Sequence, residues 1–383
     1  MSSLACFARR WRHWLPRALL LTLGAASLPV PAHTAESQAL RVMQAADLTG
    51  LGADFGRDYT TGAKVYFDYV NGNGGINGRR IVYRYKDSGG SPQRSVAEAR
   101  DFLRDGADVL FGFTGDDTVA ALARDSGIRA AGVPLFAPVA GASPVGPKEG
   151  VYFLRSDLGQ EIRALVSHLT TVGVKSFGVA ATDDDYGRNA VRLLEGELKA
   201  HQARLLGRAH MSLQGDGPDR AAQELLRSRP QAVLVLADTL AVAQFVKRYR
   251  AVDPGAFLCA PSQVNVRTLI SIVGPQTARG LIVTQVVPDP HAILPVTREH
   301  VKLMGIYTDE PVSQATLEGF LAAKALVQSL RRTRDLSHNG IQQALRESGR
   351  LDLGGFNLNF GKSPRPSNFV EVTVVSRNGQ LLR

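Results

Sequence analysis

Short apolar segments alternate with segments of helical periodicity from Leu40 almost to the C-terminus, and this alternation constrains the fold more than any other feature. The expected strands are residues 40–45, 81–85, 109–113, 135–138, 176–181, 232–237, 257–260 and 281–287. The expected helices are residues 58–70, 95–104, 118–123, 161–170, 189–200, 220–226, 240–249, 296–304 and 313–330. Strands separated by helices predict an α/β protein with parallel sheets covered on both faces.

The expected strands are too many for one comfortable sheet, so we expect two doubly wound lobes. The segment "GVYFLRSD", residues 150–157, ends one run of strand–helix units, and Ser176 opens the next. Right-handed crossovers place the strand C-termini, and any ligand site, along one edge of each sheet.

The stretch "NGNGGINGRRIVYRYKD", residues 71–87, is dense in glycine at its start. A loop that cradles phosphate follows a strand and opens a helix, because the helix N-terminus offers free N–H groups. This stretch does the reverse, since it follows an expected helix and precedes an expected strand. It also misses the dinucleotide spacing, which would need a glycine at Asn77. We predict a helix C-cap and a tight turn.

The first 32 residues have the features of a secretory signal peptide. Residues 1–17 carry four arginines and no acid, and residues 18–28 form an apolar run of eleven. That run is shorter than the roughly 20 residues that a membrane span needs. Residues 30–32 supply small side chains at the positions that a signal peptidase reads. We expect cleavage near Ala32 and export to the periplasm.

Charge and cysteine content exclude several classes of protein. Removing the signal leaves 383 − 32 = 351 residues and lowers the net charge from +10 to +6. The remaining basic residues form no long run, so nucleic acid is not an expected partner. Cys259 is the single mature cysteine, which excludes an intrachain disulfide, and the apolar string "AFLCAP" predicts a core position. We expect a monomer.

No motif in the sequence carries catalytic chemistry. H-E-x-x-H, G-x-x-x-x-G-K-[ST], G-x-S-x-G and cysteine pairs are absent, and the eight histidines show no close metal-ligand spacing. The acidic cluster "DDDYG", residues 183–187, follows an expected strand and is interpreted as a helix cap. We therefore expect no enzyme activity, no metal and no cofactor.

Five loops that follow expected strands share one character. They are residues 46–56, 113–118, 138–143, 183–187 and 237–239. Each is small, polar or punctuated by glycine, and each offers N–H groups at a helix start or turn. Converging on one cleft, these loops would bind a small polar ligand without transforming it.

Several of these segments resemble the leucine/isoleucine/valine-binding-protein family, the type 1 periplasmic solute-binding proteins of ABC importers. The resemblance rests on "ADLTGLGADFG", "NGNGGING", "VPLFAPVAGASP", "DDDYG", "GLIVTQVVPDP" and "PVSQATLEGFLAAKALVQSLRR". It covers essentially all of the mature chain and is specific for the family rather than for a ligand. It implies two Rossmann-like lobes joined by three crossovers, with residues 38–155 plus 288–352 in lobe one and 156–287 plus 353–383 in lobe two. Such lobes close on a solute and present it to a membrane permease.

The resemblance also implies ligand-binding positions. The aromatic residue that covers the ligand matches Phe55, and the tyrosine of the second lobe matches Tyr186. Gly115 stands where a serine grips the ligand carboxylate, and Gly141 where threonine is usual. Ser262 stands where a carboxylate holds the ligand ammonium. The predicted site residues are Thr49, Gly50, Phe55, Thr114, Gly115, Asp117, Ala140, Gly141, Tyr186, Asp238 and Gln263.

The departures from the family pattern make a standard branched-chain amino acid doubtful. The two glycines lack hydroxyls, although their backbone N–H groups remain available for a carboxylate. Ser262 offers no negative charge, and an unpaired buried ammonium is costly. Asp117, Asp184 or Asp238 would replace that charge, or the ligand is an amide, a urea-like compound or a carboxylate. Besides the importer receptor, the alternatives are a periplasmic sensor that signals to a membrane kinase or regulator, and an enzyme.

Overall fold

A computed structural model describes residues 39–141, 150–213, 215–360 and 365–383, and the predicted signal peptide lies outside these ranges. The strands are β1 (Leu40–Ala46), β2 (Ile81–Asp87), β3 (Val109–Phe111), β4 (Leu135–Phe136), β5 (Val151–Tyr152), β6 (Ser176–Ala181), β7 (Arg204–His210), β8 (Ala232–Leu236), β9 (Phe257–Ala260), β10 (Ile282–Gln285), β11 (Arg350–Asp352), β12 (Asn357–Asn359), β13 (Glu371–Val375) and β14 (Leu381–Leu382). The helices are α2 (Ala53–Gly72), α3 (Pro92–Arg104), α4 (Asp116–Arg124), α5 (Ser126–Ala130), α6 (Leu158–Thr171), α7 (Asp185–Ala200), α8 (Gly217–Ser228), α9 (Thr239–Arg250), α10 (Val266–Val273), α11 (Pro275–Ala278), α12 (Pro295–Tyr307), α13 (Gln314–Leu330) and α14 (His338–Arg346).

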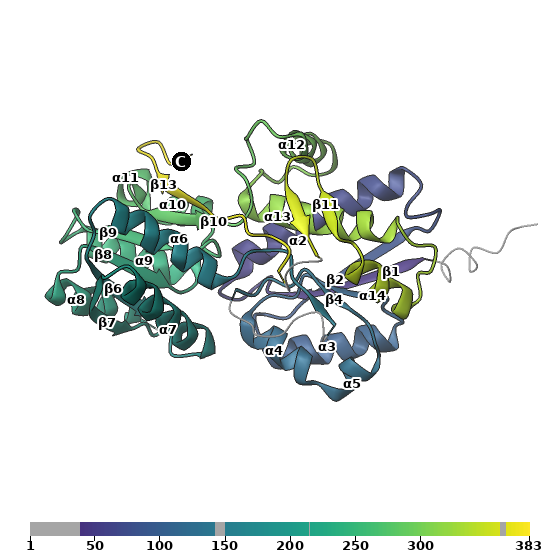
Figure 1. The fold of residues 1–383 in the computed structure, drawn as a ribbon, viewed down its shortest axis with the longest axis horizontal. Helices are drawn as coiled ribbons and strands as arrows, with labels where there is room; N and C mark the ends of the chain where they lie inside the picture. The colour runs from purple at the N-terminus through teal and green to yellow at the C-terminus, as the bar shows by residue number, and fades with distance from the viewer. Residues whose placement is uncertain (1–38, 142–149, 214, 361–364) are drawn as a thin grey trace, which may run out of the picture. The chain divides into compact units, whose positions relative to one another are not determined.

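Two separate sheets define two lobes (Figure 1). The first sheet has the order β2-β1-β3-β4-β5, and all its pairs are parallel. The second has the order β14-β13-β10-β9-β8-β6-β7 and is parallel from β10 to β7. In Figure 1 the C-terminal strand β13, drawn in yellow, runs along β10, with which it pairs antiparallel. The predicted two-lobed α/β architecture is confirmed.

Each sheet is buried on both faces because alternate strand residues enter two different cores. In β8, Val233 and Val235 pack with helices α8, α9 and α10, whereas Leu234 and Leu236 pack with α6 and α7. The first sheet has α2, α12, α13 and α14 over one face and α3, α4 and α5 over the other. This arrangement explains why the strands read as continuous apolar runs in the sequence.

The chain passes between the lobes three times, between β5 and α6, between β10 and α12, and between β12 and β13. The last passage comes later than the sequence predicted. Leu353, Phe356 and Leu358 were assigned to lobe two, but they pack in the core that contains α2 and α13. We propose that the boundary lies after Leu358.

Elements at the margins of the sheets were missed by the sequence prediction. Strand β7 has an exposed alternating pattern at a sheet edge, and β13 and β14 are short antiparallel additions. The small helices α5, α10, α11 and α14 were also missed. The long helix Gln314–Leu330 is present as predicted, and almost all of its residues are buried.

The glycine-dense stretch forms the predicted helix end and turn. Helix α2 ends at Gly72 with Asn73 as its C-cap, and Gly74, Gly75 and Gly78 adopt positive φ angles of 88°, 72° and 83°. Cys259 is also a core residue as predicted, since it is free and buried. In the described ranges no helix has both the length and the apolar character to span a bilayer.

Helices α2 and α13 meet at a glycine on each side. A Cβ added to Gly62 would overlap the carbonyl oxygen of Thr316, and a Cβ added to Gly319 would overlap that of Tyr59. The backbones therefore approach each other so closely that neither position accommodates a methyl group. This contact packs α2, which follows β1, against α13, which follows the second passage between the lobes.

We predict that Gly62→Ala lowers the free energy of unfolding by about 1–3 kcal/mol, because the helices must separate. The control is Gly196→Ala in α7, where no atom lies within 4 Å of the added Cβ. That variant should gain up to about 1 kcal/mol, because alanine is the better helix former. Urea unfolding of both variants measures the difference, and an equal gain in both would contradict the close helix contact.

Candidate ligand-binding site

A cavity of about 250 Å³ lies where the strand C-termini of both lobes meet. The first lobe contributes the segment after β1 and the ends of β3 and β4, and the second lobe contributes the segments after β6, β7, β8 and β9. The described lining residues are Asp47, Leu51, Gly52, Asp54, Phe55, Gly90, Thr114, Gly115, Val139, Thr182, Asp184, Tyr186, Leu213, Ala237, Asp238, Thr239 and Gln263.

Six of the predicted site residues line this cavity together: Phe55, Thr114, Gly115, Tyr186, Asp238 and Gln263. Phe55 is 8% exposed and stacks on Tyr59 with ring centroids 6.2 Å apart. The Tyr186 hydroxyl oxygen is buried and has no hydrogen-bond partner among the described residues. Burial, with the negative charges of Glu161 and Asp116, raises the pKa of Tyr186 well above its usual value.

The other five predicted site residues do not line the cavity. The Thr49 hydroxyl donates to Asp87 at 2.5 Å, and the Gly50 N–H donates to Asp47 at 2.6 Å, so both residues shape the turn after β1. Ala140 is fully buried, and its carbonyl accepts from Arg365. Asp117 is an exposed residue of the first turn of α4, where burial and the charges of Asp184 and Asp185 raise its pKa.

The fifth of these residues, Gly141, lies directly beside the cavity. A Cβ at Gly141 would be 3.3 Å from the Leu158 Cβ and 3.8 Å from the Gln263 amide nitrogen. A threonine, which the family usually has here, would therefore crowd the start of α6.

The structure corrects the idea that glycine N–H groups replace the missing hydroxyls. The Gly115 N–H donates to the carbonyl of Val139 at 2.9 Å, and the Gly141 N–H donates to the Asp116 carboxylate at 3.3 Å. Both amides are therefore already engaged inside the first lobe and are not available to a ligand carboxylate.

Helix α2 begins five residues earlier than predicted, at Ala53, and this places Asp54 and Phe55 in its first turn. The Asp47 carboxylate accepts from the N–H groups of Gly50 and Gly52, at 2.6 and 2.8 Å, and so orders the turn that starts the helix. Asp54 was missed by the sequence analysis. No pattern in the sequence points to it, because the helix was expected to begin only at Asp58.

Aspartates also cap the second-lobe helices that start at the cavity. Asp184 caps α7 by accepting from the Gly187 N–H at 2.8 Å, as the sequence predicted for this cluster. Asp238 caps α9 through Oδ1, which accepts from Leu240 and Ala241 at 2.9 and 3.0 Å. The dipole ends expected to attract a ligand anion are therefore occupied by the protein's own carboxylates.

Two carboxylate oxygens at the cavity have no partner. Oδ2 of Asp54 and Oδ2 of Asp238 are buried and make no hydrogen bond within the described part of the chain. Burial raises the pKa of both residues above the ordinary aspartate value. Backbone hydrogen bonds partly offset this rise in both, and the side chains of Thr239 and Thr268 also do so for Asp54. The charge of Asp54 also raises the pKa of Asp238.

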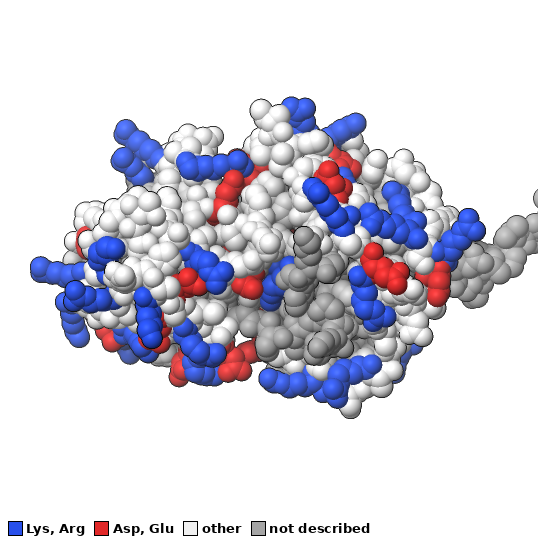
Figure 2. Space-filling model, viewed as in Figure 1, with Lys and Arg blue, Asp and Glu red and all other residues white. Residues whose placement is uncertain are grey.

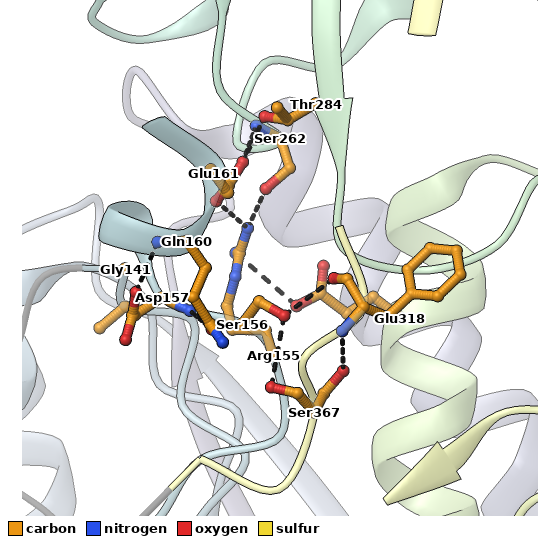
Figure 3. A network of polar contacts seen from close by, with 12 residues as sticks. Gly141, Arg155, Ser156, Asp157, Gln160, Glu161, Ser262, Thr284, Glu318 and Ser367 are labelled. Carbon is orange, nitrogen blue, oxygen red and sulfur yellow. Dashed lines mark hydrogen bonds and ion pairs between the residues drawn. The ribbon is translucent and has the colours of Figure 1, made fainter. Parts of the chain in front are cut away.

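Ser262 does not line the cavity, because it belongs to a buried network around Arg155 (Figure 3). Its hydroxyl accepts from the Arg155 guanidinium, and its N–H donates to Glu161 at 2.8 Å. Arg155 also lies 3.8 Å from Glu161 of α6 and 3.6 Å from Glu318 of α13. Ser262, at the position where the resemblance implies an ammonium-binding carboxylate, therefore belongs to the Arg155 network instead.

The same network ties the chain passages together. The Thr284 hydroxyl at the end of β10 donates to Glu161 at 2.5 Å. The Ser156 hydroxyl donates to the carbonyls of Ser367 and Phe369, at 3.4 and 2.8 Å. Ser156 in the first passage therefore contacts the third passage, and Glu161 in α6 contacts the end of β10, which precedes the second passage.

No group of three or more His, Cys, Asp or Glu side chains in the described ranges is arranged to hold a metal ion. On the face drawn in Figure 2, basic side chains are scattered over the surface with acidic ones between them.

Comparison with known proteins agrees with this architecture. A family model described as "Periplasmic binding protein" matches residues 41–379. The chain therefore belongs to the periplasmic binding protein family, as its resemblance predicted.

Individual relatives support the same placement. A substrate-binding periplasmic protein from Ralstonia solanacearum superposes with a TM-score of 0.85 at 32% identity, over 90% of this chain and 99% of that one. A fatty acid ABC transporter substrate-binding protein from Thermomonospora curvata shares the fold, with a TM-score of 0.81 at 18% identity over 90% and 91% of the chains. A Leu/Ile/Val-binding protein homolog from Brucella melitensis is 34% identical over 67 residues, which span 18% of either chain.

We predict that Asp54→Asn stabilises the ligand-free protein at pH 7 and raises its Tm by about 1–3 °C. The raised pKa of Asp54 means that its protonated form favours the fold, and this contribution is lost as the pH rises through the folded-state pKa. The gain should therefore shrink toward pH 4.

The control is Asp125→Asn, at the N-cap of α5. Hydrogen bonds from Ile128 and Arg100 lower the pKa of Asp125, so its contribution is present at pH 7 and is lost as the pH falls. This variant should have an unchanged or lower Tm at pH 7. Thermal unfolding at pH 4 and pH 7 measures both, and a lower Tm for Asp54→Asn at pH 7 would contradict the pKa shift.

We predict that Arg155→Leu costs about 3–5 kcal/mol of stability, because it leaves Glu161 and Glu318 buried without a cation. Arg163→Leu is the matched control, since Arg163 also pairs with a glutamate, Glu197 at 3.0 Å, but its side chain is 63% exposed. The control should cost about 0–1 kcal/mol. Equal losses in urea unfolding would show that the buried network adds nothing.

Proposed function

We propose that this protein is an exported receptor that traps a small polar solute between its two lobes and delivers it to an ABC importer without transforming it. The observation that carries this proposal is the cavity at the strand C-termini, where both lobes contribute polar groups. Ligands of open α/β sheets bind at this edge, and a cleft between two lobes closes by hinge motion.

Membership of the periplasmic binding protein family supports export and solute binding. The relative from Thermomonospora curvata, described as an ABC transporter substrate-binding protein, supports a permease as the membrane partner. The buried, unpartnered groups Asp54 Oδ2, Asp238 Oδ2 and Tyr186 OH support an occupied state, because a ligand that bonds them removes an unfavourable burial.

A thermal-shift screen of residues 33–383 tests solute binding. The solutes are amino acids, amides, amines, aromatic acids and small carboxylates at neutral pH. A ligand at 100 times its Kd should add about 2.7 kcal/mol of stability. Stabilisation by one class supports a receptor, whereas no shift with any class would contradict it. Import by the receptor with its permease and ATPase in proteoliposomes then tests delivery, and binding without import would favour a sensor.

We predict that Tyr186→Ala weakens the ligand identified by this screen at least tenfold, about 1.4 kcal/mol, because it removes a ring and a buried hydroxyl from the cavity wall. Tyr307→Ala is the control, because Tyr307 is 41% exposed on α12 and does not line the cavity. Isothermal titration of both variants measures the change. Unchanged affinity in Tyr186→Ala would remove this residue from the site.

A further inference from the structure

The charged groups of the cavity all have one sign. Its described lining contains four aspartates, Asp47, Asp54, Asp184 and Asp238, and among those lining residues there is no Lys, Arg or His. The nearby first turn of α4 adds Asp116 and Asp117. A ligand anion would enter this cavity against several carboxylates and without a cationic side chain in the described wall.

The four lining aspartates differ in how many carboxylate oxygens have a hydrogen-bond partner. Both carboxylate oxygens of Asp47 accept hydrogen bonds, from the N–H groups of Gly50 and Gly52. Asp184 uses Oδ1 for the Thr182 hydroxyl and the Gly187 N–H. Asp54 and Asp238 each keep Oδ2 buried and without a hydrogen-bond partner. These two acceptors come from opposite lobes, one from the first turn of α2 and one from the N-cap of α9.

The glycine N–H groups expected to be available for a ligand carboxylate are engaged elsewhere. The Gly115 N–H donates to the carbonyl of Val139, and the Gly141 N–H donates to the carboxylate of Asp116. A carboxylate brought into the cavity would therefore lose its water without recovering hydrogen bonds at these positions, which costs several kcal/mol. An amino group would meet two unpaired acceptors instead.

The rest of the cavity wall is suited to the apolar part of a ligand. Phe55, Val139 and the Tyr186 ring line the cavity beside the aspartates, and Leu51 and Leu213 add exposed apolar side chains, at 50% and 40% exposure. A hydrocarbon or ring attached to the cationic group packs against these residues, and aromatic faces also attract cations.

We propose that the solute is a small organic cation with N–H donors and no carboxylate, a primary amine, amidine or guanidine, held from the two lobes by Asp54 and Asp238. This inference rests on the proposed receptor function. Because the two acceptors belong to different lobes, one ammonium or guanidinium group that bonds both also links the lobes, so binding and closure share the same contacts.

Isothermal titration with matched probes tests the charge preference. The first set is 3-methylbutan-1-amine, leucine and 4-methylpentanoate, which share an alkyl group and carry the amine alone, both groups or the carboxylate alone. The second set is agmatine and arginine, which differ by the carboxylate. The amine-only member of at least one set should bind at least tenfold tighter than its partners.

Variants then locate the contact. Asp54→Asn and Asp238→Asn should each weaken the bound amine at least tenfold, and asparagine still caps α9 in the second variant. Asp125→Asn, which removes an N-cap carboxylate away from the cavity, should leave the affinity unchanged. Unchanged amine affinity in both cavity variants would overturn the assignment of these two aspartates.

The failures of the two proposals are distinguishable. Tighter binding of leucine, arginine, 4-methylpentanoate or a neutral amide than of every amine would overturn the cation inference and leave the receptor function standing. The absence of any stabilising solute in the wider screen would contradict both.

Discussion

The buried guanidinium of Arg155 is the interaction on which the two-lobed structure depends. It lies in the first passage between the lobes and bonds or pairs with Glu161 and Ser262 of the second lobe and with Glu318 of the first. A buried charge needs partners of opposite sign, and Glu161 and Glu318 supply them from the two lobes, although Nε and Nη1 of Arg155 have no hydrogen-bond partner among the described residues. Figure 3 shows both glutamates converging on the guanidinium.

The network also determines the chemistry of the cavity next to it. The resemblance implies a carboxylate for the ligand ammonium at Ser262, but the hydroxyl and N–H of this residue are used by Arg155 and Glu161. Negative charge lines the cavity at Asp54 and Asp238 instead, on helix starts that face each other from the two lobes. Both positions are costly without a ligand, because burial disfavours an ionised carboxylate.

Much of the architecture was predictable because each sheet is buried on both faces. Apolar runs in the sequence indicated the strands β1, β3, β6, β8, β9 and β10, and helical periodicity indicated the long helix α13. Strand β7 was not predictable in the same way, since it lies at the edge of the sheet and exposes alternate residues to solvent, and β13 is short and only partly buried. Six residues that line the cavity were predicted from the sequence. Asp54 was not, because nothing in a single sequence shows that a first-turn acid is left without a partner.

The sequence by itself determined the fold family, the turn at residues 71–80, the cap of α7 and the absence of the hydroxyls at Gly115 and Gly141. These depend on local periodicity and on residue types that act through neighbours close in the chain. Only the tertiary structure decided that both glycine amides are already engaged, that Ser262 serves Arg155, and that Asp54 and Asp238 face one cavity with free oxygens. Those facts depend on partners far away in the chain, 25 residues for Gly141 with Asp116 and 107 for Ser262 with Arg155, whose positions are determined by the packing of whole lobes.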